Sequence, residues 1–189
     1  NTGVVQLISA EYTGPLHFVE FWLDVIDEWQ KEKRKDVLVA LSTTKDVQDA
    51  ILADKKRSAI VDIIDIRYWH YQFNGQTYEP KGGQNLAPRQ HARLLNPKRS
   101  SAEQVYRAVN EYRIKYPSKA VVYNGDSFDA NGWAVLMAGG SIPSFSFDLP
   151  QEISAQLIDM QPIQWSGQAN TPWVLGQHGQ GYLVYSENA

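Results

Sequence analysis

The chain has 189 residues, of which 43% are hydrophobic and 21% charged, so it is long and apolar enough to bury a full core. Its net charge of -3 and the lack of a basic stretch argue against nucleic acid as a partner. The absence of cysteine excludes disulfides, thiol nucleophiles and zinc–thiolate sites, and no apolar run is long enough to span a bilayer.

Short, continuously apolar segments alternate with amphipathic ones along most of the chain. Strands are expected at residues 4–8, 36–42, 59–66, 119–124 and 142–147. Helices are expected at residues 16–33, 44–52, 101–116, 131–137 and 150–160. Strands that are apolar throughout are typical of a parallel sheet covered on both faces, joined by right-handed crossovers. The fold class is therefore α/β.

Two helices carry a clear apolar face. In the first, Phe18, Trp22, Val25, Ile26 and Trp29 recur at helical spacing, with acidic residues opposite. In the helix at 150–160, residues 153, 157 and 158 are expected to face inward. The tail at 173–186 predicts two strands joined by a glycine-rich turn.

The number of β–α units leaves two architectures open. A complete (β/α)₈ barrel needs about 250 residues, whereas this chain supplies about five units. It is either the C-terminal portion of a TIM barrel or a self-sufficient doubly wound sheet. A strand almost at the first residue and a terminal hairpin without a third strand suggest a fragment of a longer protein, which favours the barrel portion.

The carboxyl ends of parallel strands meet at one edge, where α/β enzymes do their chemistry. The residues expected there are Glu11, Ser42, Thr43, Arg67, Tyr68, Trp69, His70 and Asp126. Glycoside hydrolysis needs two carboxylates about 5 Å apart for retention, or about 6.5–9.5 Å apart for inversion. Glu11 and Asp126 are the candidate catalytic pair. A long loop at 72–99 adds Gln84, Asn85, Arg89 and His91 as candidate substrate ligands.

Each candidate also has a structural interpretation. Glu11 can cap the following helix or pair with Lys45, and Asp126 lies in a turn-like Asn-Gly-Asp-Ser string. Asp65 lies within a strand and is expected to pair with neighbours rather than react. His70 can be a satisfied pocket imidazole. The spacing of the four His, and the lack of a phosphate loop, a dinucleotide fingerprint and a nucleophile elbow, predict neither a metal nor a cofactor.

Four segments together resemble a known family. They are Glu-Tyr-Thr-Gly-Pro at 11–15, and the runs at 44–52, 64–69 and 81–91. The chain is similar over nearly its whole length to apiosidase-like bacterial glycoside hydrolases, a family that pairs a (β/α)₈ barrel with a C-terminal β-sandwich, sometimes labelled a collagen-binding domain. The resemblance implies a secreted enzyme of carbohydrate metabolism, periplasmic or extracellular. It also implies a partial barrel at 1–165 (strands 4 to 8) and the start of a truncated sandwich at 166–189.

In that resemblance Glu11 takes the place of the acid/base and Asp126 that of the nucleophile. Ala10 stands where related enzymes have Asn, and Asp126 where they usually have Glu. The partners implied are a carbohydrate substrate and the remainder of the same polypeptide, which would supply the missing half-barrel. Two alternatives stay open: a non-catalytic carbohydrate-binding protein on a degenerate barrel, and an interaction module without a carbohydrate role.

Overall fold

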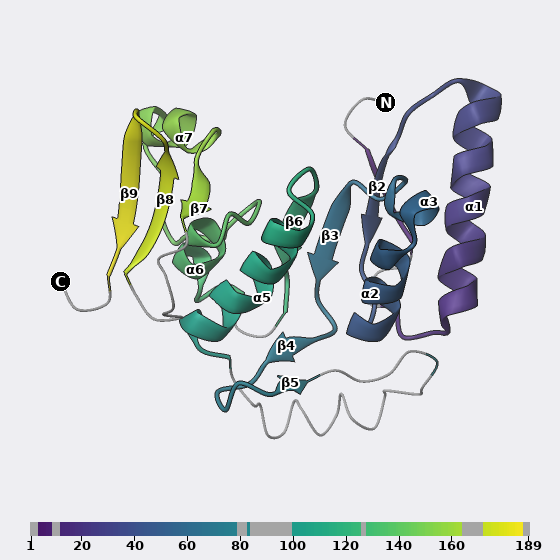
Figure 1. Cartoon of the computed structure of the whole chain (residues 1–189), viewed down its shortest axis with the longest axis horizontal. Coiled ribbons are helices and arrows are strands. Elements are labelled where there is room, and N and C mark those ends of the chain that lie inside the picture. Colours follow the sequence, from purple (N-terminus) through teal and green to yellow (C-terminus); the bar gives the residue numbers. More distant parts are fainter. Residues whose placement is uncertain are drawn as a thin grey trace.

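A computed structural model of the chain describes residues 4–8, 12–78, 83, 100–125, 128–163 and 172–186. These residues form a four-stranded parallel sheet with its helices, a two-stranded hairpin and a three-stranded antiparallel sheet (Figure 1).

The parallel sheet has the order β1-β2-β3-β6, so the strands of this sheet lie side by side in the order in which they occur along the chain. Its strands are β1 (Val5–Leu7), β2 (Leu38–Leu41), β3 (Ile63–Ile66) and β6 (Ala120–Tyr123). The connections contain α1 (Leu16–Lys33), α2 (Lys45–Ala53), α3 (Lys55–Ser58) and α5 (Ala102–Lys115). The parallel pairing of the first four expected strands and helices α1, α2 and α5 are confirmed, whereas α3 was not expected. The strand order never reverses within the described sheet.

Two helix starts show how the sequence sets these boundaries. Ser101 caps α5, where its hydroxyl accepts a hydrogen bond from the backbone N–H of Gln104 at 3.3 Å. Asp54 caps α3 in the same way, with its carboxylate accepting from the N–H of Lys56 at 2.9 Å. The polar residue that follows each loop therefore satisfies donors that the first helical turn leaves without partners.

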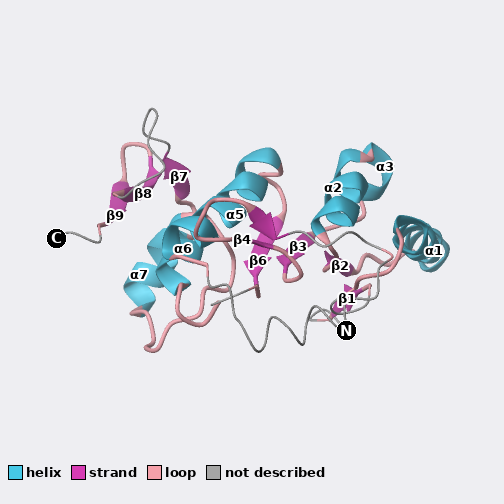
Figure 2. Ribbon diagram, turned by 90° about the horizontal axis from the view of Figure 1, so that it is seen from below, coloured by secondary structure: helices cyan, strands magenta, loops and turns pink. Residues whose placement is uncertain are grey.

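The two faces of the parallel sheet have different surroundings. Helices α1, α2 and α5 lie on the same side of the strands (Figure 2). Side chains directed to that side are completely buried, as Leu41 and Ile64 illustrate. On the opposite side Val5, Leu7 and Leu38 keep 42, 39 and 47% of their surface exposed. Right-handed crossovers along an unreversed strand order place successive helices on one face, which explains the difference.

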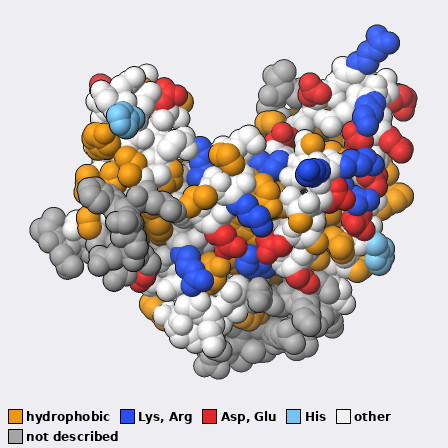
Figure 3. Space-filling model, in the orientation of Figure 1, with side chains coloured by type: hydrophobic (Ala, Val, Ile, Leu, Met, Phe, Trp, Pro, Cys, Tyr) orange, Lys and Arg blue, Asp and Glu red, His pale blue; other side chains and the backbone are white. Residues whose placement is uncertain are grey.

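Helix α1 is present as expected, but its aromatic face is exposed to solvent. The side chains it buries are Val19 and Leu23, whereas Phe18, Trp22 and Trp29 are each 41% exposed. Charged side chains also gather over α1, α2 and α3 on the face shown in Figure 3.

The segment expected to form a fifth parallel strand, residues 142–147, does not form one; that prediction was wrong. Only Ser141 bridges β6, through a single parallel contact with Val122. The next residue, Ile142, has a φ of 55° and is exposed. A β-branched residue in the left-handed region turns the chain out of the extended path, so the strand cannot continue.

Two further sequence expectations need correction. Residues 72–99 were expected to be loop, but Thr77–Tyr78 (β5) pairs antiparallel with His70–Tyr71 (β4). Helix α7 (Gln151–Leu157) follows α6 (Gly132–Met137) as expected, yet Ile153 and Ile158 are exposed rather than inward.

The C-terminal sheet has three strands rather than the two expected. The hairpin of β8 (Trp173–Gln177) and β9 (Gly181–Tyr185) is confirmed, and β7 (Gln161–Ile163) pairs antiparallel with β8. This sheet therefore begins before residue 166, inside the range expected for the barrel.

An aromatic stack joins the C-terminal sheet to the helices. Trp173 stacks on Tyr106 of α5 with ring centroids 4.6 Å apart and on Tyr185 at 5.1 Å, and Tyr185 lies 6.0 Å from Trp133 of α6. Successive stacked rings of this kind add to the apolar burial that holds the C-terminal sheet against α5 and α6. No helix in the described part of the chain is long and apolar enough to cross a membrane.

Candidate functional site

The candidate site lies at the carboxyl ends of β2, β3 and β6. Of the residues that the sequence singled out, Arg67, Tyr68, Trp69 and His70 follow β3 directly. The other six candidates lie outside the described residues: Glu11, Gln84, Asn85, Arg89, His91 and Asp126. The site is therefore built below from the side chains that the structure places.

Asp65 is the centre of this edge. It lies in β3, is 5% exposed, and accepts a hydrogen bond from the side-chain amide of Asn124 at 2.7 Å. Arg67 Nε lies 3.2 Å from the other carboxylate oxygen, an ion pair rather than an aligned hydrogen bond. Asn124 is held in turn by its backbone N–H, which donates to Ile66 O at 2.8 Å. Asp65 therefore pairs with its neighbours, as the sequence predicted.

These side chains share the helix-free face of the sheet. In parallel strands paired residues point to the same side and successive residues alternate. Asp65 pairs with Val122, so Asn124 and Arg67, each two residues further along its own strand, fall on that side. Ser42 follows Leu41, the partner of Ile64, and so lies beside Asp65 on the same face. We call Ser42, Asp65, Arg67 and Asn124 the carboxyl-edge cluster.

Two members of the cluster have polar atoms that make no hydrogen bond among the described residues. The Ser42 hydroxyl is completely buried and has no hydrogen-bond partner within the described part of the chain. The Arg67 side chain is 30% exposed and uses only Nε toward Asp65. A partly exposed guanidinium pairs well with sugar hydroxyls or with an anion, whereas the Ser42 hydroxyl is enclosed beside it.

Tyr12 extends the edge beyond β2. Its backbone N–H donates to Ser42 O at 3.2 Å, and it forms a parallel bridge with Thr43. Its ring stacks on Phe18 with centroids 5.2 Å apart, and burial raises the pKa of its phenol. The residue after Glu11 in the sequence therefore lies at the carboxyl edge, at the opposite end of the sheet from Asn124.

Trp69 lies on the other side of the sheet, among the helices. It is completely buried, and its indole N–H donates to Gln48 Oε1 at 2.7 Å. Lys45 Nζ lies 4.7 Å from the centre of its ring. A ring enclosed on these sides supports helix packing and has no free face for a sugar.

Lys45 organises a polar network on that helix side. Its ammonium contacts Asp49 at 2.8 Å and Glu111 at 3.0 Å, with its own side chain only 10% exposed. Tyr112 donates its hydroxyl to Asp49, and Tyr71 donates to Glu111 at 2.7 Å. We call Lys45, Asp49, Tyr71, Glu111 and Tyr112 the helix-side network.

The titration of the helix-side network follows from this geometry. Burial alone would lower the pKa of Lys45, but hydrogen bonds to Asp49 and Glu111 outweigh it and raise that pKa above the ordinary value. Burial, followed by the hydrogen bond to Glu111, raises the pKa of Tyr71 to about 12. Burial and the neighbouring Asp49 also raise the pKa of Tyr112. Lys45, Tyr71 and Tyr112 therefore keep their protons at neutral pH, and the contacts that they donate stay closed, which suits a structural role.

His70 and Tyr68 are buried beside the carboxyl edge. His70 is 1% exposed and stacks on Tyr78 of β5 with ring centroids 5.1 Å apart. The hairpin of β4 and β5 therefore fixes the imidazole plane next to the candidate site. Among the described residues, no group of three His, Asp or Glu side chains is placed to hold a metal ion.

Sequence reasoning missed two polar contacts. It placed Asn124 at the end of an expected strand and in a turn-like string but gave it no role, although an amide directly after a buried strand is a signal that it belongs to the carboxyl edge. It also missed the contact of Lys45 with Glu111, because 66 residues separate the two and only the packing of α2 against α5 brings them together.

A known family model matches most of the chain. The model of a family described as "Domain of unknown function (DUF6298)" matches residues 1–160, and the chain belongs to that family. The match ends one residue before β7, so it covers the parallel sheet and its helices but not the antiparallel sheet. Comparisons with curated proteins and with solved structures found no match.

Proposed function

We propose that this member of the DUF6298 family is a glycoside hydrolase that cleaves a polysaccharide or oligosaccharide with two carboxylates, Glu11 and Asp126. The observation that supports the proposal most is the position of their described neighbours. Tyr12, next to Glu11, and Asn124, two residues before Asp126, both lie at the carboxyl edge of one parallel sheet. That edge is where (β/α) enzymes carry their reacting groups.

The arrangement of the sheet supports the same proposal. The strands follow chain order without reversal and their helices share one side, as successive units of a (β/α)₈ barrel do. We therefore propose that β1, β2, β3 and β6 are strands 4 to 7 of a TIM barrel. The antiparallel sheet would belong to a following β-sandwich.

In the proposed mechanism Glu11 protonates the leaving glycosidic oxygen and later takes a proton from water. Asp126 attacks or stabilises the oxocarbenium-like sugar. Arg67 binds sugar hydroxyls, while Asp65 and Asn124 hold Arg67 in position. By the family resemblance we expect a periplasmic or extracellular location.

The proposal is tested with the full-length protein on a panel of polysaccharides and oligosaccharides, by release of reducing ends. Glu11→Gln should lower kcat on the order of 10²–10⁴-fold, because a general acid contributes about that much. Glu32→Gln is the matched control, since Glu32 lies on the exposed surface of α1 with 70% of its side chain exposed. Wild-type turnover by Glu11→Gln would overturn the assignment of the acid.

The same panel separates the hydrolase from its main alternative. Asp126 stands where the resembled family usually has Glu, and Ala10 stands where it has Asn. These two departures favour a glycan-binding protein as the second candidate. Tight binding of a glycan without turnover would support that candidate and contradict the hydrolase. Where turnover is found, the anomeric configuration of the first product decides between a retaining and an inverting mechanism.

A further inference from the structure

Helix α1 presents three different flanks, which follow from its spacing of roughly 100° per residue. Val19 and Leu23 face the sheet and are completely buried. On one side of that buried face, Glu20 and Asp24 face α3. On the other side lie Phe18, Trp22 and Trp29; we call them, together with Phe21 opposite the buried face, the aromatic stripe.

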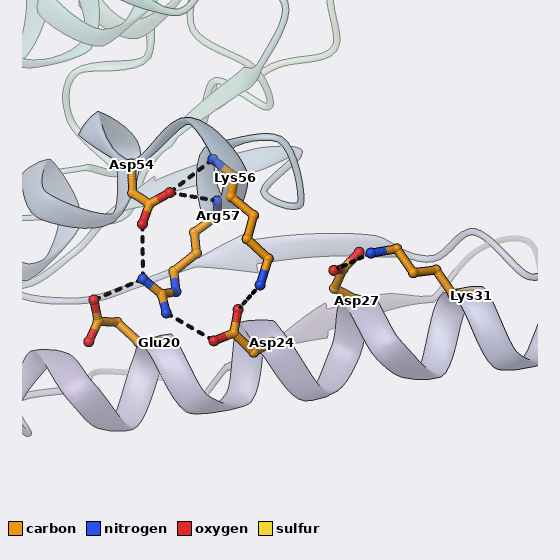
Figure 4. A network of polar contacts seen from close by, with 7 residues as sticks. All are labelled: Glu20, Asp24, Asp27, Lys31, Asp54, Lys56 and Arg57. Atoms are coloured by element: carbon orange, nitrogen blue, oxygen red, sulfur yellow. Dashed lines mark hydrogen bonds and ion pairs between the residues drawn. The ribbon is translucent and has the colours of Figure 1, made fainter.

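The flank toward α3 is an interface already formed. Arg57 contacts Glu20 at 3.0 Å, Asp24 at 2.9 Å and Asp54 at 2.9 Å (Figure 4). Lys56 adds a contact with Asp24 at 2.9 Å, and its hydrogen bond, followed by that of Arg57, lowers the pKa of the Asp24 carboxyl. This side of α1 thus receives the helices of the next β–α unit.

The aromatic stripe contacts no other helix through a ring or polar contact among the described residues; only Tyr12 stacks on Phe18, at the N-terminal end of the stripe. Its four rings are 41–59% exposed, and three of them touch, with centroids 6.2 Å apart for Phe18 and Trp22 and 5.4 Å for Phe21 and Trp22. Single exposed apolar residues are ordinary, but a contiguous aromatic patch on one helix flank marks an interaction surface.

Strand β1, at the same end of the sheet as α1, also has an edge without a partner strand among the described residues. Among the described strands β1 pairs only with β2, so one of its edges carries no ladder. Val5 and Leu7 of that strand are exposed on the helix-free face. Edges of parallel sheets are normally covered, since their strands are apolar on both sides. Strand β1 and helix α1 lie at the same end of the sheet (Figure 2).

We infer that the β1 edge and the aromatic stripe form one interface, occupied by a further β–α unit of the same polypeptide. Its strand adds parallel to β1, and the apolar face of its helix packs on Phe18, Trp22 and Trp29. The relation repeats the one already present between the first two units, where β2 pairs with β1 and α3 packs on α1. Because strand order rises from β1 to β6, the next position belongs to an earlier part of the polypeptide.

A second copy of this chain fits the surface less well. A two-fold axis at this edge would pair β1 with β1 antiparallel, against the parallel direction of every pair in the sheet. A head-to-tail copy would need the free edge of β6, where Ser141 already bridges Val122. The inference rests on the barrel proposed above, but it concerns packing alone and its test does not depend on glycan hydrolysis.

Hydroxyl-radical footprinting of the native full-length protein, read by mass spectrometry, tests the inference. Trp22 and Trp29 should be oxidised as slowly as the buried Trp69, whereas Phe73 and Tyr182, which are 65 and 59% exposed, react readily. Rates normalised to the denatured protein remove differences in intrinsic reactivity. The protection should be unchanged on dilution and without lipid.

Three outcomes would overturn the inference. Oxidation of Trp22 and Trp29 at exposed-residue rates would show a surface that stays open. Protection lost on dilution would assign the surface to a second copy, and protection that requires anionic vesicles would assign it to a membrane. None of these readouts depends on turnover, so a failure here is distinguishable from a failure of the hydrolase proposal.

Discussion

The two faces of the parallel sheet carry polar groups of different kinds. On the helix side, Lys45, Asp49, Glu111, Tyr71 and Tyr112 satisfy one another in a closed network. On the helix-free side, the carboxyl-edge cluster leaves part of the Arg67 guanidinium exposed, and the buried Ser42 hydroxyl has no hydrogen-bond partner among the described residues. Closed polar networks stabilise packing, whereas groups held in place with spare hydrogen-bonding capacity can bind a ligand.

The largest effect on the free energy of unfolding is expected from Leu38 and Leu41, two residues of β2 that point to opposite faces of the sheet. Leu41→Ala should lower the free energy of unfolding by roughly 2–5 kcal/mol, because Leu41 is completely buried. Leu38 is 47% exposed here, yet the proposed barrel would enclose it. In the full-length protein Leu38→Ala should therefore cost nearly as much by chemical denaturation. A cost below about 1 kcal/mol would mean that this face stays open.

Lys45→Met tests the helix-side network. The loss of the cation should lower the free energy of unfolding by about 2 kcal/mol, less than for a fully buried pair because Asp49 and Glu111 are 40 and 35% exposed. Lys31→Met is the control: Lys31 pairs with Asp27 at the same i,i+4 spacing but is 71% exposed, so its cost should be below about 0.5 kcal/mol. Equal effects of the two variants would contradict the structural role of the network.

Asn124→Ala tests the carboxyl-edge cluster. It removes one hydrogen bond from the buried Asp65 carboxylate, and the expected cost is about 1.5 kcal/mol, together with weaker glycan binding in a binding titration. Asn74→Ala, in the exposed β4–β5 turn, should change neither quantity measurably. Unchanged glycan affinity in Asn124→Ala would separate the cluster from the site.

The smallest effect is a change in alkaline stability. The folded pKa of Tyr71 is raised to about 12 from 10, so its contribution is complete below pH 10 and is lost as pH rises toward 12. Tyr71→Phe cannot ionise and should reduce the fall in melting temperature between pH 10 and pH 12. An unchanged slope would show that Tyr71 does not remain protonated in this range.

Much of the parallel sheet was predictable from local patterns. Apolar runs ending at Leu41 and Tyr123 predicted β2 and β6, and Ser101 marked the start of α5. The paired state of Asp65 also followed from the cost of a buried charge. These features depend on residues close in sequence, or on a penalty that any fold must satisfy.

Features set by distant contacts or by single backbone angles were not predictable. The apolar run at 142–147 predicted a strand, but the positive φ of Ile142 ends it after one bridge. Strand β7 is short and contains Pro162, so the sequence there shows no strand pattern from which its pairing with β8 could be predicted. Trp69 was expected to bind substrate, and only the packing of α2 and α5 shows that its ring is enclosed.

The most direct test of the difference between the two faces compares two glutamates, measured side by side for kcat and melting temperature in the full-length protein. Glu11→Gln should abolish glycan turnover and leave the melting temperature near that of the wild type. Glu111→Gln, which weakens the contacts with Lys45 and Tyr71, should lower the melting temperature and leave kcat unchanged. Loss of turnover in Glu111→Gln with full activity in Glu11→Gln would contradict the account.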